Sequence, residues 1–364
     1  MHIVHTEADG GKGGQPLRII NESLGMLQRG HTVTILCPDE APLNTLAREA
    51  GLTVVNLPLR RKNLSNLLLL RRWLASHDVD VVNSHNSADT WLVALAALTL
   101  KNSPPLVRTR HASGKPRNNR TTRWLFAKAC AHVVTTGEAL RHQLVEIGVP
   151  LNHSTSVPSG VDTARFKPGD KQAARAHCGL SQHDFWLGVV SHLRPNKGHS
   201  VLLKALAAID KPEIKLAIVG EGPHRATLEQ EILTLGLQDR VVMAGHRSDP
   251  QAWFPAFDIA LSPSHDMEGV PQGVLQSLAS CIATIATDAG GTGDAVIDGK
   301  TGLLVAQQDA VALKNAILTL WQDEALRERL AQQGYDYLNN HFTRECMLRD
   351  MERVFSRAVE QAGR

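Results

Sequence analysis

The chain has 364 residues, of which 43% are hydrophobic and 21% are charged, a composition typical of soluble globular proteins. This length exceeds what one hydrophobic core usually supports, so we expect two domains. The five cysteines are widely separated and form no Cys-x-x-Cys pair, which argues against both a disulfide framework and a cysteine zinc site.

Charge is distributed unevenly along the chain. The first 157 residues have a net charge of +7 and the remainder a net charge of −4. The basic half indicates an anionic partner, such as a membrane surface or a phosphorylated glycan. We expect no nucleic-acid partner, because the basic stretches lack interleaved aromatic residues. The N-terminus has no signal-peptide pattern and no apolar run could span a bilayer, so we expect a cytoplasmic protein.

The first half of the chain alternates β-rich apolar runs with helical patterns, which is typical of parallel α/β architecture. Strands are predicted at His2–His5, Thr32–Cys37, Thr53–Leu57, Val79–Asn83, Leu106–Arg110 and His132–Thr135. Between the first two strands, a helix is predicted over Gln15–Arg29, with Leu17, Ile20, Leu24 and Leu27 on one face.

The second half repeats this alternation. Strands are predicted at Phe185–Val190, Ile214–Val219, Val241–Ala244, Ile259–Ser262, Ala283–Ala286 and Leu303–Val305. The proline-containing stretch 148–168 is the best linker, so we expect two doubly wound, Rossmann-like domains facing each other across a cleft. We place the first at 1–157 and the second at 158–342, with a terminal helix in 343–364 packing back on the first domain.

The most informative motif is Ser264–Gln276, where Glu268-Gly269 follows an apolar strand and opens an amphipathic helix. The first N–H groups of a helix are unpaired and the helix dipole favours negative charge. This helix start can therefore hold a phosphate or a hydroxyl-rich ligand.

A second motif, Arg194-Pro195-Asn196-Lys197-Gly198, follows the strand Phe185–Val190. Its two cations stand at the carboxyl end of a strand, where α/β proteins bind ligands, and could clamp a diphosphate. A solvated loop with incidental charge is the alternative, and position favours the functional interpretation.

Two glycine-rich loops follow predicted strands. The loop Gly10–Gly14 lets the backbone approach a ligand closely, but it completes neither a Walker nor a dinucleotide motif, so a flexible turn explains it equally well. The stretch Gly220–Arg225 is better explained as a tight strand–helix turn with Pro223 at the first helical position.

Other charged clusters have ordinary explanations as well. Asp78 and Asp80 are better interpreted as the turn before a buried strand than as metal ligands. The run from Arg108 to Arg123 holds six basic residues in sixteen; a solvated loop and a site for a phosphorylated acceptor explain it equally. His111 is a candidate cleft residue. The segment Arg60–Trp73 is best explained as a helix that covers the sheet, and peripheral membrane contact is the secondary explanation.

Together these segments resemble the family-4 glycosyltransferases of the GT-B fold, along essentially the whole chain. The matching segments are Gly13-Gly14, Arg29–Thr34, Pro158–Asp162 with Arg165-Phe166, Arg194–Gly198, Val219–Pro223, Glu268–Gln276, Thr287–Gly291 and Asp298–Val305. The chain looks most like bacterial enzymes of lipopolysaccharide and other surface-glycan assembly. The resemblance implies a retaining sugar transfer from a nucleotide-sugar donor, bound in the second domain, to a glycan or glycolipid acceptor, bound mainly in the first. It also implies no metal and no other cofactor. The basic first half adds the expectation of contact with the inner face of the cytoplasmic membrane.

The resemblance also implies roles for single residues. The catalytic set is His111, Arg194, Lys197 and Glu268. The donor-binding set is Gly13, Gly14, Gly220, Gly269, Val270 and Gln276. The basic residues themselves, and not the resemblance, predict an acceptor-binding or anion-binding set of Lys12, Arg108, Arg110, Lys115 and Arg117. Two positions depart from the family pattern: Gln276 replaces a second acidic residue, and Pro271 replaces a glycine and removes one backbone donor.

Two other functions fit the same residues. A nucleotide-sugar epimerase or hydrolase would consume donor without an acceptor. A non-catalytic subunit, suggested by Gln276, would bind a nucleotide-sugar without turnover. A nicotinamide dehydrogenase is disfavoured because neither glycine-rich loop completes the dinucleotide fingerprint.

Overall fold

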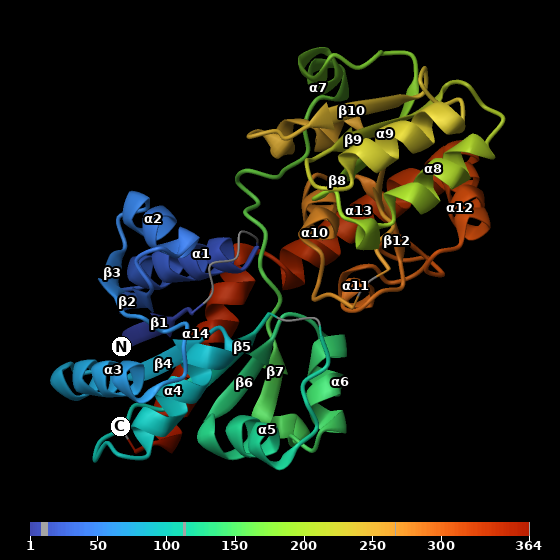
Figure 1. Ribbon diagram of the computed structural model, residues 1–364. Coiled ribbons are helices and arrows are strands. Elements are labelled where there is room, and N and C mark those ends of the chain that lie inside the picture. The colour runs from blue at the N-terminus through green and yellow to red at the C-terminus, as the bar shows by residue number, and fades with distance from the viewer. Residues whose placement is uncertain (9–13, 112–113, 266, 364) are drawn as a thin grey trace. The chain divides into compact units, whose positions relative to one another are not determined.

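A computed structural model describes residues 1–8, 14–111, 114–265 and 267–363. The chain divides into two compact units (Figure 1). Unit 1 comprises Met1–Ser159 and Glu345–Arg364, and unit 2 comprises Gly160–Arg344. The chain thus leaves unit 1 within the expected linker and returns to it at the start of the last helix.

Unit 1 is built on a sheet with strand order β3-β2-β1-β4-β5-β6-β7, in which neighbouring strands pair in parallel. Its strands are β1 (His2–Thr6), β2 (Thr32–Cys37), β3 (Thr53–Asn56), β4 (Val81–Ser84), β5 (Leu106–Arg110), β6 (His132–Thr135) and β7 (Ser154–Ser156). Its helices are α1 (Gly14–Gln28), α2 (Pro42–Glu49), α3 (Leu64–Ser76), α4 (Ser87–Ala97), α5 (Arg120–Trp124), the π-helical η1 (Leu125–Ala129), α6 (Glu138–Glu146), the short turn η2 (Leu151–His153) and α14 (Arg344–Gln361).

Unit 2 is built on a second parallel sheet, with strand order β10-β9-β8-β11-β12-β13. Its strands are β8 (Phe185–Val190), β9 (Ile214–Val219), β10 (Val241–Gly245), β11 (Ile259–Ser262), β12 (Ala283–Thr287) and β13 (Leu303–Val305). Its helices are α7 (Lys171–Cys178), α8 (His199–Ala207), α9 (Arg225–Thr234), α10 (Gln272–Ala279), α11 (Thr292–Ala295), α12 (Ala310–Gln322) and α13 (Glu324–His341), with short turns η3 (Pro195–Lys197), η4 (Pro250–Ala252) and η5 (Phe254–Ala256).

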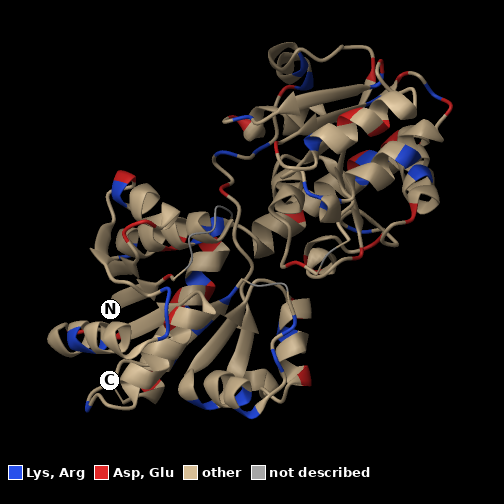
Figure 2. Ribbon diagram, viewed as in Figure 1, with Lys and Arg blue, Asp and Glu red and all other residues tan. Residues whose placement is uncertain are grey.

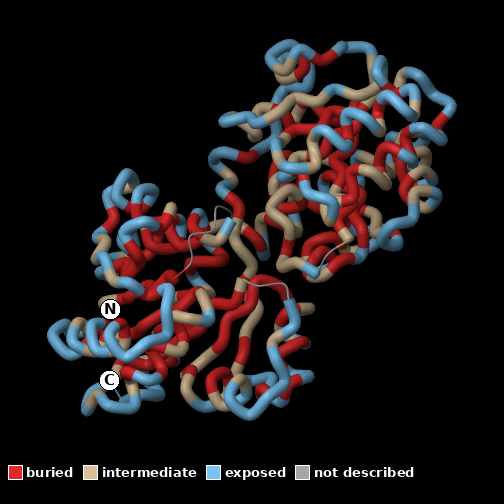
Figure 3. Tube along the Cα trace, viewed as in Figure 1, coloured by how far each residue is buried: buried red, intermediate tan, exposed pale blue. Residues whose placement is uncertain are grey.

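The central strands of both sheets are buried, while the helices that cover the sheets expose their outer faces (Figure 3). Helices on both faces explain why the strands are near-continuous runs of Val, Ile, Leu and Ala. No helix in the described ranges is long and apolar enough to cross a bilayer. The α/β fold class expected from the alternating pattern is confirmed.

The apolar face predicted for α1 is only partly buried: Ile20 packs in a hydrophobic cluster, with Leu24 against it. Leu17 is 55% exposed and Leu27 is 39% exposed. The buried side of the helix instead includes the charged pair Arg18 and Glu22, together with Gly25. A pattern of leucines could not reveal this rotation, because two charged residues that neutralise each other occupy part of the buried face.

The last helix, α14, completes the core of unit 1. Met347, Met351 and Phe355 pack in one cluster with Ile3 of β1 and with residues of β4, β5 and β6. Where α1 meets α14, a Cβ atom on Gly25 would lie 2.3 Å from a methyl carbon of Leu348. The absence of a side chain at this glycine therefore lets α14 pack close to α1.

Each sheet has one point where the direction of strand order reverses. It lies between β1 and β4 in unit 1, and between β8 and β11 in unit 2. Open α/β sheets bind ligands in the crevice outside the carboxyl ends of the strands at such a switch point. The loops that follow these four strands are therefore the first places to look for functional side chains.

Candidate active site

In unit 2, the switch point brings together the loops that follow β8 and β11. The Nζ atom of Lys197 donates to both carboxylate oxygens of Glu268, at 2.6 and 2.8 Å. The two side chains are 22% and 23% exposed, so the ion pair is partly accessible to solvent. Residues 71 positions apart thus meet because both follow strands that are neighbours in the sheet.

Ser264 and Asn196 link the two loops beneath this ion pair. The Ser264 hydroxyl lies 3.0 Å from Glu268 Oε1 and 3.1 Å from the carbonyl oxygen of Asn196. The backbone N–H of His265 also donates to the Asn196 carbonyl, at 3.0 Å. These contacts hold the Lys197 turn against the Glu268 loop, so the ion pair is a built feature and not a chance surface contact.

Two glycines let the backbones around the pair approach closely. Gly198 has φ +73°, and a Cβ atom there would lie 1.8 Å from the carbonyl oxygen of Pro263. Gly290, after β12, has φ +57°, and a Cβ atom there would lie 2.2 Å from the carbonyl oxygen of Glu268. The next N–H, that of Gly291, donates to this same carbonyl at 2.8 Å. Side chains at these positions would push Glu268 out of place.

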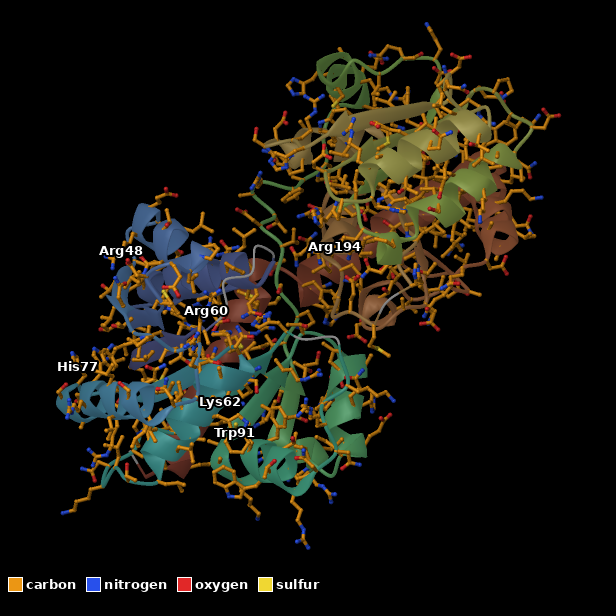
Figure 4. The ribbon with its side chains drawn as sticks, in the orientation of Figure 1. Arg48, Arg60, Lys62, His77, Trp91 and Arg194 are labelled. Atoms are coloured by element: carbon orange, nitrogen blue, oxygen red, sulfur yellow. The ribbon has the colours of Figure 1, made fainter. Side chains whose placement is uncertain are left out.

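Arg194 is exposed and precedes the η3 turn that carries Lys197 (Figure 4). Within the described part of the chain its guanidinium has no hydrogen-bond or ion-pair partner. Its five N–H donors are available to an anion. On the other side of the ion pair, α10 begins at Gln272, with Gly269 and Val270 in the preceding loop.

In unit 1, three histidine rings form a continuous row at the switch point. His5 Nδ1 lies 2.9 Å from His85 Nε2, and His85 Nδ1 lies 3.0 Å from His111 Nε2. His5 is on β1, His85 follows β4 and His111 follows β5. By the strand register, each ring lies two residues closer to the carboxyl end than its predecessor, on the same face of the sheet.

A buried ion pair on α1 stands beside the first ring of this row. Arg18 Nε lies 3.5 Å from Glu22 Oε2, and Glu22 Oε1 lies 3.9 Å from His5 Nε2. Glu22 Oε1 also accepts from the Asn83 amide at 3.2 Å, and the oxygen of that amide accepts from the Thr109 hydroxyl at 2.8 Å. Polar side chains therefore connect α1 with the carboxyl ends of three adjacent strands.

Burial keeps the three histidine rings neutral. It lowers the pKa of His5 to about 3, with Arg18 acting in the same direction. The pKa values of His85 and His111 lie well below 6.5, again chiefly because of burial and then because of nearby charges, Arg108 among them. Near neutral pH each ring therefore has one N–H and one bare nitrogen.

Two family models match the two halves of the chain: Glycosyltransferase Family 4 over residues 12–165 and Glycosyl transferases group 1 over residues 170–337. The chain belongs to the family-4 glycosyltransferases. It is therefore an enzyme of sugar transfer, as the resemblance implied.

This glycosyltransferase has relatives in sequence and in fold. LpsB, the lipopolysaccharide core biosynthesis mannosyltransferase of Rhizobium meliloti, is 25% identical over 254 residues, which are 67% of this chain and 70% of LpsB. A GDP-mannose-dependent alpha-(1-6)-phosphatidylinositol monomannoside mannosyltransferase of Mycolicibacterium smegmatis is 28% identical, over 82% of this chain and 84% of its own length. Among solved structures, that of Anabaena Alr3699/HepE in complex with UDP superposes with a TM-score of 0.88 at 20% identity, covering 98% of this chain and 100% of that one. These similarities confirm the two-domain GT-B fold.

The structure places the predicted site residues of the glycosyltransferase in different settings. Lys197 and Glu268 meet, and the half-buried His111 forms a row with the buried rings of His5 and His85. Lys12 and Gly13 lie outside the described residues, while Gly14 is exposed at the start of α1. The remaining donor-binding candidates lie near the carboxyl edge of the unit 2 sheet.

Gly220 and Val270 have structural reasons for their identity. Gly220 has φ +148°, and a Cβ atom there would lie 1.9 Å from the Ser191 carbonyl oxygen, so it permits close contact between the loops after β9 and β8. Val270 is 7% exposed and packs in the hydrophobic core. Gln276, on α10, is half-buried, and its side chain has no partner among the described residues.

The basic run of unit 1 is not one exposed surface. Arg108 and Arg110 are on β5 and are 5% and 3% exposed, whereas Lys115 and Arg117 are exposed in the following loop. Burial lowers the pKa of Arg108, while Asp89 opposes this shift. Neither a solvated loop nor a continuous anion site describes the whole run.

Sequence reasoning missed His5, His85 and the Glu22 pair. The sequence did hold a signal, since His5 is next to the end of the first strand and His85 directly follows the fourth. Joining them required the knowledge that β4 pairs with both β1 and β5. The predicted structural role of the Asp78-Asp80 segment is supported by a 2.6 Å hydrogen bond from the His2 N–H to Asp80.

Proposed function

We propose that the chain transfers a sugar from a nucleotide-sugar donor to a hydroxyl of a glycan or glycolipid acceptor, with retention of anomeric configuration. The proposed setting is the assembly of lipopolysaccharide or another surface polysaccharide. Named relatives act in lipopolysaccharide core and capsular polysaccharide biosynthesis. The observation that carries the proposal is the Lys197–Glu268 pair at the switch point of unit 2, next to the unpartnered Arg194.

Arg194 and Lys197 suit the leaving group of such a reaction. When the bond between the anomeric carbon and the phosphate oxygen breaks, its electron pair stays with the nucleoside diphosphate. Preorganised cations stabilise this negative charge as it develops. The Lys197 ammonium has three N–H groups, so it can contact Glu268 and a phosphate oxygen together. We expect no metal ion to be required, because these two side chains supply the positive charge.

Glu268 suits the sugar part of the donor. Its carboxylate can accept hydrogen bonds from sugar hydroxyls, and the N–H groups of Gly269 and Val270 can donate to them. Gln276 would contact the ribose with a neutral amide in place of the family's carboxylate. We assign acceptor binding to unit 1, where His111 stands at the switch point. The acceptor oxygen then bonds to the anomeric carbon on the face that the phosphate leaves, and its proton passes to a phosphate oxygen.

The test is transfer from a panel of nucleotide-sugars to lipid-linked and free oligosaccharide acceptors. Donors are first selected by thermal shift, because a ligand that binds the folded state raises its stability. Arg194→Ala and Lys197→Ala should each lower kcat by about a hundredfold or more. The control Lys204→Ala, at an exposed position of α8, should leave kcat unchanged.

Three outcomes contradict the proposal. Unchanged turnover in Arg194→Ala would remove its assigned role. Donor consumption without an acceptor, at the rate seen with one, would indicate an epimerase or hydrolase. Donor binding without turnover against any acceptor would indicate a non-catalytic subunit.

We also propose that α3 of unit 1 contacts the inner surface of the cytoplasmic membrane. Leu64 and Leu68 are 69% and 41% exposed, and basic residues precede and follow them in unit 1 (Figures 2 and 4). Among these, Arg60 and Lys62 lead into the helix and Arg72 lies within it. Exposed leucines beside cations match an anionic lipid surface.

Vesicle sedimentation tests this contact. The full chain should sediment with phosphatidylglycerol vesicles and not with phosphatidylcholine vesicles. The double variant Leu64→Ser/Leu68→Ser should weaken sedimentation, whereas Leu233→Ser, at a 54% exposed position of unit 2, should not. Equal binding by both variants would contradict the assignment to α3.

A further inference from the structure

The ring contacts of His5, His85 and His111 restrict where the protons of these rings can lie. Each of the two contacts joins two imidazole nitrogens, so each contact holds one proton. Three neutral rings share three protons, and two of these occupy the contacts. The third proton is therefore either on His5 Nε2, at the α1 end of the row, or on His111 Nδ1, at the other end.

The charged pair on α1 selects between the two arrangements. The Arg18 guanidinium stays protonated in proteins, and a buried cation requires a compensating anion. Glu22 is that anion: it lies 3.5 Å from Arg18 and accepts from the Asn83 amide. Its Oε1 atom faces His5 Nε2 at 3.9 Å. An N–H at His5 Nε2 is attracted by this carboxylate, whereas a lone pair there is repelled by it.

The third proton therefore belongs on His5, and His111 Nδ1 is left bare. This nitrogen has no hydrogen-bond partner in the part of the chain that the structure describes. His111 is half-buried, whereas His5 and His85 are fully buried, and His5 Nε2 is a buried atom without a hydrogen-bond partner among the described residues. His111 Nδ1 thus lies at the accessible end of the row, at the carboxyl edge of the sheet.

We propose that His5 and His85 are positioning residues that fix the tautomer of His111, so that His111 Nδ1 accepts a hydrogen bond from a ligand hydroxyl. The donor of that bond is a polyhydroxylated molecule, the sugar or its acceptor; this identity alone rests on the proposed function. Glu22 determines which nitrogens of the three rings are protonated, and it does so without touching the ligand. An imidazole with the opposite tautomer would present an N–H and would select an acceptor group instead.

The direct test is ¹⁵N NMR of the full chain labelled at histidine. A bare imidazole nitrogen resonates far downfield of a protonated one, so the spectrum reports each tautomer. The His111 signals are assigned by their loss in His111→Gln. The expected result for the wild type is a bare Nδ1 and a protonated Nε2, without any ligand present. A protonated Nδ1 in the wild type would overturn the proposal, and this result needs only the spectrum of His111→Gln beside that of the wild type.

Two isosteric variants test whether His5 determines the tautomer. In His5→Leu, His85 Nε2 faces an apolar group, and a buried unpaired N–H there is unfavourable, so the proton should move to His111 Nδ1. In His5→Asn, the side-chain oxygen can accept from His85 Nε2, so His111 Nδ1 should stay bare. Both variants lose the same ring volume, which controls for packing. A bare Nδ1 in both variants would show that His5 does not act through the row.

Kinetics provide a second readout. In the transfer assay, kcat/KM should fall about threefold to tenfold in His5→Leu and recover in His5→Asn. The double variant His5→Leu/His111→Gln should be no slower than His111→Gln alone, because both changes remove one interaction. Additive losses would contradict the coupling. If no sugar transfer is found, the proposed function fails. The tautomer of His111 is still tested, because the NMR measurement does not depend on activity.

Discussion

Acidification should destabilise unit 1 through its buried histidines. An imidazole in the unfolded chain titrates near pH 6.5, whereas burial lowers the pKa of His5 to about 3 and those of His85 and His111 well below 6.5. Below pH 6.5 the unfolded chain therefore binds protons that the folded unit does not. By linkage, the free energy of unfolding falls as the pH falls through this range.

The size of the effect follows from these shifts. Between pH 7 and pH 5.5, each ring that stays neutral in the fold removes about 1.3 kcal/mol, and the three rings together remove about 4 kcal/mol. His132, whose pKa burial lowers to about 4, acts in the same direction. Asp89 acts in the opposite direction: burial raises its pKa to about 6, so acidification returns about 0.8 kcal/mol. Burial also raises the pKa of Glu22, with the same sign as Asp89.

Hydrogen exchange of β4 and β5 amides in the full chain measures this loss locally, after correction for the intrinsic pH dependence of exchange. The variant His111→Asn has one titrating ring fewer, so its loss between pH 7 and pH 5.5 should be smaller by about 1.3 kcal/mol. His142→Asn, at an exposed position of α6, should behave like the wild type. Equal losses in His111→Asn and the wild type would show that His111 is protonated in the fold, and the reasoning would be wrong.

Three further substitutions test the packing around the site. Gly290→Ala should abolish most transfer, because its Cβ would lie 2.2 Å from the Glu268 carbonyl oxygen. Gly299→Ala is the control, because Gly299 also has a positive φ but a Cβ atom there would meet no atom within 4 Å. In thermal unfolding this control should lose only about 1–2 kcal/mol of stability, and its transfer rate should not change. Glu268→Gln should lower kcat/KM for the donor about tenfold while changing stability by less than about 1 kcal/mol, since its ion pair is partly exposed; a large drop in melting temperature would contradict this. Gly25→Val should destabilise unit 1 by about 1–3 kcal/mol in urea unfolding through its contact with Leu348, and the added change Leu348→Ala should restore part of the loss if that contact is the cause.

The strands were predictable because parallel sheets covered on both faces require apolar β-rich runs. Thr32–Cys37, Leu106–Arg110 and Phe185–Val190 match their predicted bounds. The short strand Ser154–Ser156 escaped prediction, because three polar residues in the expected linker have no such pattern. Its ladder to β6 is a tertiary feature, supplied by a neighbour and not by its own sequence.

The Lys197–Glu268 contact could be anticipated for a different reason. Both residues follow strands, and the carboxyl ends of parallel strands meet at one edge of a sheet, so a general rule placed two distant motifs together. The row of histidines needed more information. Which strands are neighbours depends on the order β1-β4-β5, and the proposed tautomer depends on the Arg18–Glu22 pair, which a hydrophobic pattern does not reveal.

The two switch points of this glycosyltransferase therefore differ in their chemistry. In unit 2, Lys197 and Arg194 are cations at a partly exposed edge, and charge is what a departing diphosphate requires. In unit 1, His111 can accept a hydrogen bond from a hydroxyl only while its ring is neutral, and burial, with Arg18 and Arg108 acting in the same direction, lowers its pKa. Burial alone cannot select a tautomer, because the two tautomers of the row have the same charge. Glu22 selects between them, because its carboxylate favours a proton on His5 Nε2 and so leaves His111 Nδ1 bare. The buried ion pair on α1 is thus explained by the orientation it imposes on three rings more than by any stability it adds, since a buried pair of this kind contributes little net free energy.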